Sequence, residues 1–186
     1  MDETAPFHAP HHDRYDDDHV EAILAGVNVI AMVGASANTS RPSYFVLKYL
    51  TEKGYRVHPI NPGRAGSTIC GRTVYATLAD VPEPIDMVDV FRAADAVPGV
   101  VDEVLALSPL PKVLWLQLSV RNDAAAVRAE AAGLTVIQNR CPKIEYGRLS
   151  GEISWAGVNS GRVSARRPLR REGFQRLGLR PGGEGA

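Results

Sequence analysis

A stretch of small and polar residues, VGASANTSRPS at positions 33–43, has the composition of an anion-binding turn. It follows an apolar run and precedes a segment with helical spacing. A backbone of small residues can approach a phosphate closely, and the free amides at a helix N-terminus point towards such an anion. The positive charge of an arginine and the hydroxyl groups of serines add further contacts. The residues that we expect to contact the anion here are Gly34, Ala35, Ser36, Ser40, Arg41 and Pro42.

Further polar and aromatic residues stand at the ends of the other predicted strands. In an open parallel sheet, ligands lie beyond the carboxyl ends of the strands, where the strand order reverses. The residues found there are Asn61, Pro62 and Arg64 after the second strand, Phe91 and Arg92 after the third, and Gln117 at the end of the fourth. Arginines beside a serine-lined turn indicate an anionic, phosphorylated ligand.

Two common nucleotide sites are not supported by the sequence. A dinucleotide fingerprint has three spaced glycines and an acidic residue after the second strand. Here only Gly34 is present, and the second strand ends in Asn61 and Pro62. A P-loop requires a Lys followed by Ser or Thr after its glycines, and this pair is absent. Both departures argue against the usual dinucleotide and P-loop sites without naming the ligand.

No catalytic residue and no metal site is predicted. Cys141 could be a thiol whose pKa is lowered by nearby cations, and could form a mixed disulfide with a thiol ligand. The alternative is a small residue at which the chain turns. Asp86 is expected to border its strand, and Asp89 to meet a basic residue across the crevice. The N-terminal His8, His11 and His12 could touch a metal, but no carboxylate or cysteine accompanies them at ligand spacing.

The elements that must position these residues alternate along the chain. Apolar runs at 27–33, 55–62, 85–91, 112–118 and 134–139 predict strands buried on both faces. Helical spacing at 16–28, 42–54, 94–107 and 122–132 predicts the helices between them. Such alternation favours right-handed βαβ units. We therefore predict an α/β, Rossmann-like, doubly wound domain with a five-stranded parallel sheet, and a short helical turn near 77–81.

Composition and charge set the domain limits and the class of protein. The chain has 186 residues with no net charge and no apolar run of bilayer-spanning length. The N-terminus has no secretory pattern and the two cysteines form no framework, so we expect a cytoplasmic protein that does not bind membranes. We expect a flexible tail at 1–15, one ligand-binding domain at 16–160, and a basic, mobile tail at 161–186. Nucleic-acid binding is not expected, because no aromatic residues are interleaved with the tail's arginines.

Five motifs together resemble a known family. They are GASANTSRPS, PINPG, VFRAADAVPGVVDE, VLWLQLSVRND and VIQNRCPKIEYGRLSG. Their sequence is similar to the small stand-alone CoA-binding proteins, whose domain is similar to the N-terminal CoA-binding domain of the succinyl-CoA synthetase α-subunit. The resemblance covers about residues 20–165.

The resemblance implies CoA or an acyl-CoA as the ligand, bound across the carboxyl edge of the sheet. The diphosphate would lie near residues 34–36 and 40–42. Asn61 and Pro62 would meet the adenosine end, and Phe91, Arg92 and Val97 would line the far side. The phosphorylated histidine domain of the synthetase has no counterpart here, and His58 lies inside a strand.

The function predicted from the sequence is therefore CoA binding without catalysis by this chain. The alternative is an enzyme: a nucleotide-dependent oxidoreductase, or an acyl-CoA-handling subunit whose catalytic partner is a separate protein. The absence of an acid after the second strand and of a base–nucleophile pair favours the first hypothesis. The sequence is compatible with a protein partner but does not identify one.

Overall fold

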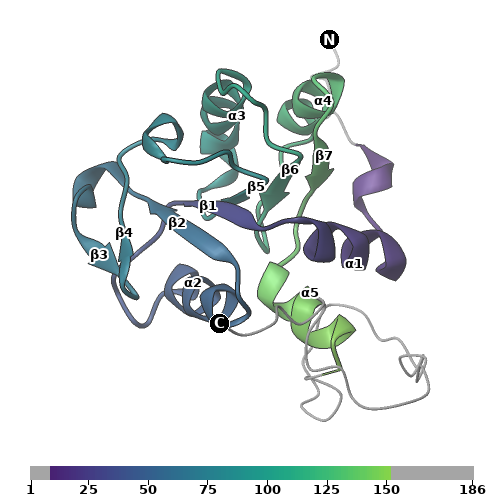
Figure 1. The fold of residues 1–186 in the computed structure, drawn as a ribbon. Helices are drawn as coiled ribbons and strands as arrows, with labels where there is room; N and C mark the ends of the chain where they lie inside the picture. The colour runs from purple at the N-terminus through teal and green to yellow at the C-terminus, as the bar shows by residue number, and fades with distance from the viewer. Residues whose placement is uncertain (1–8, 152–186) are drawn as a thin grey trace.

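A five-stranded parallel sheet in the order β2-β1-β5-β6-β7 forms the centre of the computed structural model (Figure 1), which describes residues 9–151. The strands of this sheet are β1 (Val29–Val33), β2 (Arg56–Ile60), β5 (Met87–Val90), β6 (Val113–Leu116) and β7 (Thr135–Ile137). The α-helices are α1 (Asp17–Gly26), α2 (Pro42–Glu52), α3 (Val97–Leu105), α4 (Asp123–Ala131) and α5 (Pro142–Leu149). The predicted doubly wound, Rossmann-like fold is confirmed.

The strand order reverses between β1 and β5. The chain passes from β1 to β2 on one side and then returns to β5 on the other side of β1. Open α/β sheets bind their ligands at such a switch point, outside the carboxyl ends of the strands. The fold therefore directs attention to the residues that follow Val33 and Val90.

Helices cover both faces of the sheet. Helices α1, α2 and α5 lie on one face, and α3 and α4 lie on the other (Figure 1). Alternate strand residues point to opposite faces, so that Met32 packs in the first layer and Ala31 in the second. Trp115 is fully buried in the first layer.

The Gly- and Pro-rich segment after β2 packs against the edge of the sheet. It contains the 3₁₀ helix η2 (Pro62–Arg64) and a hairpin of β3 (Thr68–Ile69) and β4 (Arg72–Thr73). Tyr75 then continues the sheet beside β2: its N–H donates to the Pro59 carbonyl, and its carbonyl accepts from the Asn61 N–H, both at 2.9 Å. The predicted helical turn is η3 (Leu78–Asp80), which begins in a capping box formed by Thr77 and Asp80.

Residues 9–15 differ from the expected flexible tail. They contain the 3₁₀ helix η1 (Pro10–His12), and Ala9, His12 and Tyr15 are buried. The Ala9 N–H donates to Asp123 at 2.7 Å, and Arg121 donates to Asp13. Pairs with residues more than a hundred positions away hold this segment on the domain, and no local sequence pattern reveals them.

Helix α5 was not predicted, and it packs beside α1 and α2. Arg148 donates to both Glu145 and Asp17, which joins α5 to α1. None of the helices in the described range is long and apolar enough to cross a bilayer. The predicted basic tail at 161–186 lies outside the described residues.

Candidate functional site

Gly34 lies where two backbone segments approach each other closely at the switch point. Its φ is +82°, which is a left-handed conformation that side chains rarely adopt. A Cβ at this position would lie 2.4 Å from the Phe91 carbonyl oxygen. The backbones that follow β1 and β5 therefore meet here, and only glycine fits between them.

The turn after Gly34 is shaped by its own side chains. The Ser36 hydroxyl accepts from the Asn38 N–H at 3.2 Å, and the Asn38 side chain accepts from the Ser40 N–H at 2.8 Å. These short-range bonds hold the chain in a loop before Pro42 begins α2. Asn38 was not among the predicted residues, although an Asn two positions before a Ser in a turn is a recognisable signal.

Asn61 connects the ends of β1 and β2. Its side chain donates to the Ala35 carbonyl at 2.8 Å and accepts from the Gly63 N–H at 3.0 Å. Ala35 is buried, whereas Pro62 is exposed. Asn61 thus uses its polar groups to position the two loops, and Pro62 lies beside them at the surface.

Three arginines follow three neighbouring strands. Arg41 lies beyond β1, Arg64 beyond β2 and Arg92 beyond β5, and all three are exposed. None of their guanidinium groups has a hydrogen bond or ion pair within residues 9–151. The Arg92 side chain crosses Gly34, since its Cδ would lie 3.1 Å from a Cβ there. We call residues 34–42, 61–64 and 91–92 the switch-point half of the carboxyl edge.

Two predicted residues lie deeper than expected. Val97 is fully buried at the start of α3, where it packs in the second core layer. Gln117 is buried and donates to Asp89 at 2.8 Å. In this conformation Val97 offers a ligand no surface, while Phe91 is half-buried directly after β5. The position of a residue at a strand end therefore predicts the region in which it lies, but not whether its side chain is exposed there.

Asp89 meets Gln117 rather than the basic residue that we expected. Its side chain is fully buried, and burial raises its pKa. The Gln117 hydrogen bond offsets part of this rise, and the resulting pKa is about 7. One carboxylate oxygen, Oδ2, has no hydrogen-bond partner in the described part of the chain. Asp86 borders β5, as predicted. It accepts hydrogen bonds from the Asn28 and Val29 N–H groups at the start of β1.

Cys141 is not the activated thiol that its cationic neighbours suggested. It is buried at the N-terminus of α5, and burial raises its pKa to about 11. Backbone N–H groups of Lys143 and Ile144 lower the pKa, but by less than burial raises it. The thiol therefore stays protonated at neutral pH, which disfavours nucleophilic chemistry in this conformation.

The carboxyl ends of β6 and β7 have a different character. Arg121 donates to Asp123, to Asp13 and to the Ala9 carbonyl. Arg140 donates to the Asn139 carbonyl and stacks over the Tyr15 ring at 5.4 Å. We call residues 117–123 and 138–140, together with 9–15, the anchored half of the carboxyl edge. Its cations are already used by the protein's own groups.

The comparisons with known proteins identify the family. The family model of the CoA binding domain matches residues 28–147, which include the switch-point half and residues 117–123 and 138–140 of the anchored half, but not residues 9–15. The chain belongs to this family of CoA-binding domains, as the five motifs indicated. The matched range falls inside the domain predicted at 16–160.

Relatives of two kinds are similar to this chain. The uncharacterized protein YneT of Bacillus subtilis (strain 168) is 32% identical over 127 residues, covering 68% of this chain and 91% of YneT. The α subunit of ADP-forming acetate–CoA ligase I from Pyrococcus furiosus is 33% identical over 78 residues. That match covers 40% of this chain and only 17% of the ligase subunit.

Solved structures share the fold over most of their length. The cell-free protein ID.343 of Thermus thermophilus has a TM-score of 0.66 and 38% identity, with 70% of this chain and 96% of that chain covered. A hypothetical protein from Pyrococcus horikoshii OT3 has a TM-score of 0.66 and 34% identity, covering 78% of this chain and 96% of its own.

Proposed function

We propose that this protein binds CoA, or an acyl-CoA, at the switch-point half and holds it without transforming it. Membership of the CoA-binding domain family supports the ligand. The observation that carries the location is the set of three exposed arginines, Arg41, Arg64 and Arg92, beyond three adjacent strands. These guanidinium groups have no partner within residues 9–151, and Arg41 stands at the N-terminus of α2, which suits the diphosphate and phosphate groups of CoA.

The loop geometry supports the same location. Gly34 lets the backbone come close to a ligand, and the Ser36–Asn38–Ser40 bonds hold the turn in place before binding. A site that is already ordered loses less conformational entropy when the ligand binds. The anchored half is a poorer candidate because its arginines have protein partners.

The proposal that the chain lacks catalysis rests on the groups near the site. The Cys141 thiol is buried with a raised pKa, and the His58 ring is hydrogen-bonded to Glu83 at 2.8 Å on the outer strand. Neither forms a nucleophile–base pair near the switch point. The ligase relative matches over a small part of its length, so its reaction is not carried over to this chain.

A thermal-shift panel with CoA, acetyl-CoA, NAD, NADP and ATP tests the ligand. A ligand that binds only the folded state raises Tm, by an amount that grows with its concentration relative to Kd. We expect stabilisation by CoA and acetyl-CoA, and none by NAD. Stabilisation by NAD without any by CoA would refute the proposal.

A further inference from the structure

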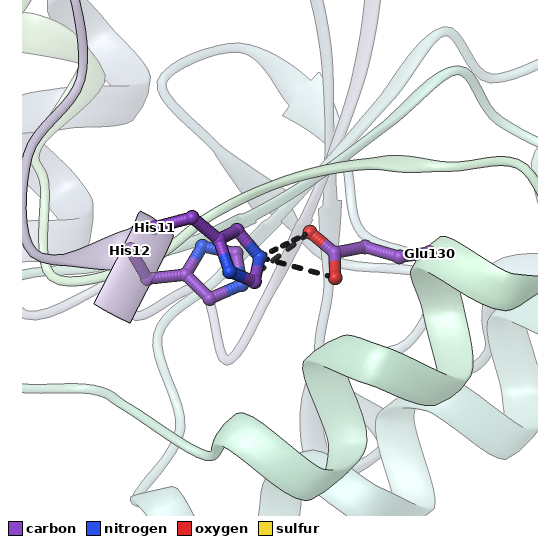
Figure 2. A group of neighbouring side chains, drawn as sticks. All are labelled: His11, His12 and Glu130. Atoms are coloured by element: carbon purple, nitrogen blue, oxygen red, sulfur yellow. Dashed lines mark hydrogen bonds and ion pairs between the residues drawn. The ribbon is translucent and has the colours of Figure 1, made fainter. Parts of the chain in front are cut away.

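Three potential metal ligands converge at a place remote from the proposed CoA site. His11 and His12 come from η1, and Glu130 comes from α4, 119 positions further along the chain (Figure 2). His11 Nε2 lies 3.1 and 3.3 Å from the two Glu130 carboxylate oxygens, and His12 Nε2 lies 3.4 Å from Oε1. One donor atom from each residue lies within 4.8 Å of the others.

These separations are those of ligands that share a small cation. Zinc binds imidazole nitrogen at about 2.0–2.1 Å and carboxylate oxygen at about 2.0–2.2 Å, usually in a tetrahedron. On bonds of this length, neighbouring ligand atoms lie about 3.3–3.4 Å apart. The nitrogen–oxygen distances of 3.1 and 3.4 Å therefore require only small shifts to receive the ion.

His12 supplies the second observation. It is 2% exposed, and its Nε2 has no hydrogen-bond partner within residues 9–151. Its other nitrogen, Nδ1, lies 2.8 Å from the Tyr15 hydroxyl. In the tautomer whose Nδ1 carries the proton, Nε2 presents a lone pair towards Glu130, while Tyr15 fixes the ring as an outer partner of a metal ligand does.

The charge at this place suits a cation. The Glu130 carboxylate supplies negative charge beside two histidines and is itself 30% exposed, which gives an ion access from solvent.

An ordinary ion pair accounts for only part of this arrangement. His11 and Glu130 could pair at the surface, and an exposed pair of this kind contributes little to stability. That account leaves the buried Nε2 of His12, 3.4 Å from the carboxylate, without a hydrogen bond within residues 9–151. A shared cation satisfies all three groups.

We propose that His11, His12 and Glu130 bind one divalent ion of intermediate softness, Zn²⁺, and so fasten η1 to α4. Two imidazoles and a carboxylate are a known ligand set for zinc, with water in the remaining position. The ion contacts no group of the switch-point half, so its role is to hold residues 9–15 against the domain. This inference is independent of the proposed CoA binding.

Titration calorimetry of tag-free, full-length, chelator-treated protein tests the site with Zn²⁺ as the probe. We expect one Zn²⁺ per chain, an increase in Tm on loading, and no response to Mg²⁺ at equal concentration. Substituted Co²⁺ gives a visible spectrum that reports the coordination number. Hydrogen exchange of residues 10–15 should become slower when Zn²⁺ is added.

Two variants that should still fold identify the ligands. His11→Ala removes an exposed ring, and Glu130→Gln keeps the size of the side chain, so both should fold. Each should weaken Zn²⁺ binding by at least about 100-fold, since outer partners alone are worth about 10–100-fold. The matched controls are His19→Ala and Glu103→Gln, both exposed in α1 and α3, which should leave the affinity unchanged.

Circular dichroism of the metal-free variants shows whether they fold. The proposal is overturned if the wild-type protein binds no Zn²⁺, or if both His11→Ala and Glu130→Gln fold and bind it as tightly as wild type. It is equally overturned if Zn²⁺ binds without slowing exchange in residues 10–15.

Discussion

The two halves of the carboxyl edge hold their arginines in opposite situations. In the switch-point half, Arg41, Arg64 and Arg92 are exposed and have no partner in the described part of the chain. In the anchored half, Arg121 reaches Asp13, Asp123 and the Ala9 carbonyl. Both halves stand at equivalent ends of parallel strands, so position on the sheet does not decide which one is available to a ligand. Much of the difference comes from residues 9–15, which supply Asp13 and the Ala9 carbonyl to Arg121 and the Tyr15 ring to Arg140.

The largest effect is expected at Gly34. Gly34→Ala places a Cβ against the Phe91 carbonyl in a left-handed conformation, so it should destabilise the fold by about 2–3 kcal/mol. Denaturant unfolding measures the change. Gly99→Ala is the matched control, since nothing lies within 4 Å of its added Cβ. That change, inside α3, should be neutral or stabilise by up to about 1 kcal/mol. Equal effects at the two glycines would mean that the two backbones do not meet as described.

The ion pairs of the anchored half should make the stability of the protein depend on pH in the acid range. Burial raises the pKa of Asp123, but the Arg121 hydrogen bond and the Ala9 and Gln138 contacts outweigh it and lower the pKa to about 2 from 3.8. A depressed pKa contributes stability that is present above the unfolded value and lost as pH falls through the folded value. Unfolding free energy should therefore fall by about 2 kcal/mol between about pH 5 and pH 2. Asp123→Asn should lose most of this dependence, whereas the exposed Asp102→Asn should retain it.

Asp89, in the strand beside the switch point, should show the opposite slope. Its folded pKa is raised to about 7 from 3.8, so the folded state binds a proton that the unfolded state has released. Stability should fall as pH rises between these values and level off above about pH 7. Asp89→Asn resembles the neutral acid and should be more stable than wild type at pH 8 by about 1–2 kcal/mol. Stability curves that coincide at pH 8 and at pH 4 would remove Asp89 as the titrating group.

The smallest effect concerns the ligand. Arg41→Gln should weaken CoA binding about tenfold, as expected for one lost charge-assisted contact, without changing Tm of the free protein. Arg128→Gln, on α4 and paired with Asp102, removes the same charge from another surface. It should leave CoA affinity as it was. If both variants bind CoA like wild type, Arg41 does not touch the ligand. The same measurement is then made on Arg92→Gln.

Sequence patterns predicted the sheet because its strands are apolar runs buried on both faces, such as Val29–Val33. They did not predict α5, where a buried Glu145 and Gly147 interrupt the apolar pattern. They also did not predict the hairpin at Thr68–Ile69 and Arg72–Thr73, whose strands have two residues each. Periodicity requires several repeats, and these elements are too short or too polar to supply them.

The candidate site was predictable to the level of loops. The rule for parallel sheets correctly selected the turns after Val33, Ile60 and Val90 as the surroundings of the switch point. It could not show that Val97 and Gln117 are buried, because burial depends on how α3 and the neighbouring strands pack. Nor could it show Glu130 beside His11 and His12, since a contact across 119 positions has no local signature.

The pairing of Tyr75 with the outer side of β2 has a consequence for solubility. An uncovered strand at the margin of a sheet exposes main-chain groups that can recruit a strand from another molecule. Here the Pro59 carbonyl and the Asn61 N–H are both occupied by Tyr75, and Pro59 has no N–H to offer. The segment that leads away from the proposed ligand site therefore also blocks edge-to-edge aggregation at the carboxyl end of this strand.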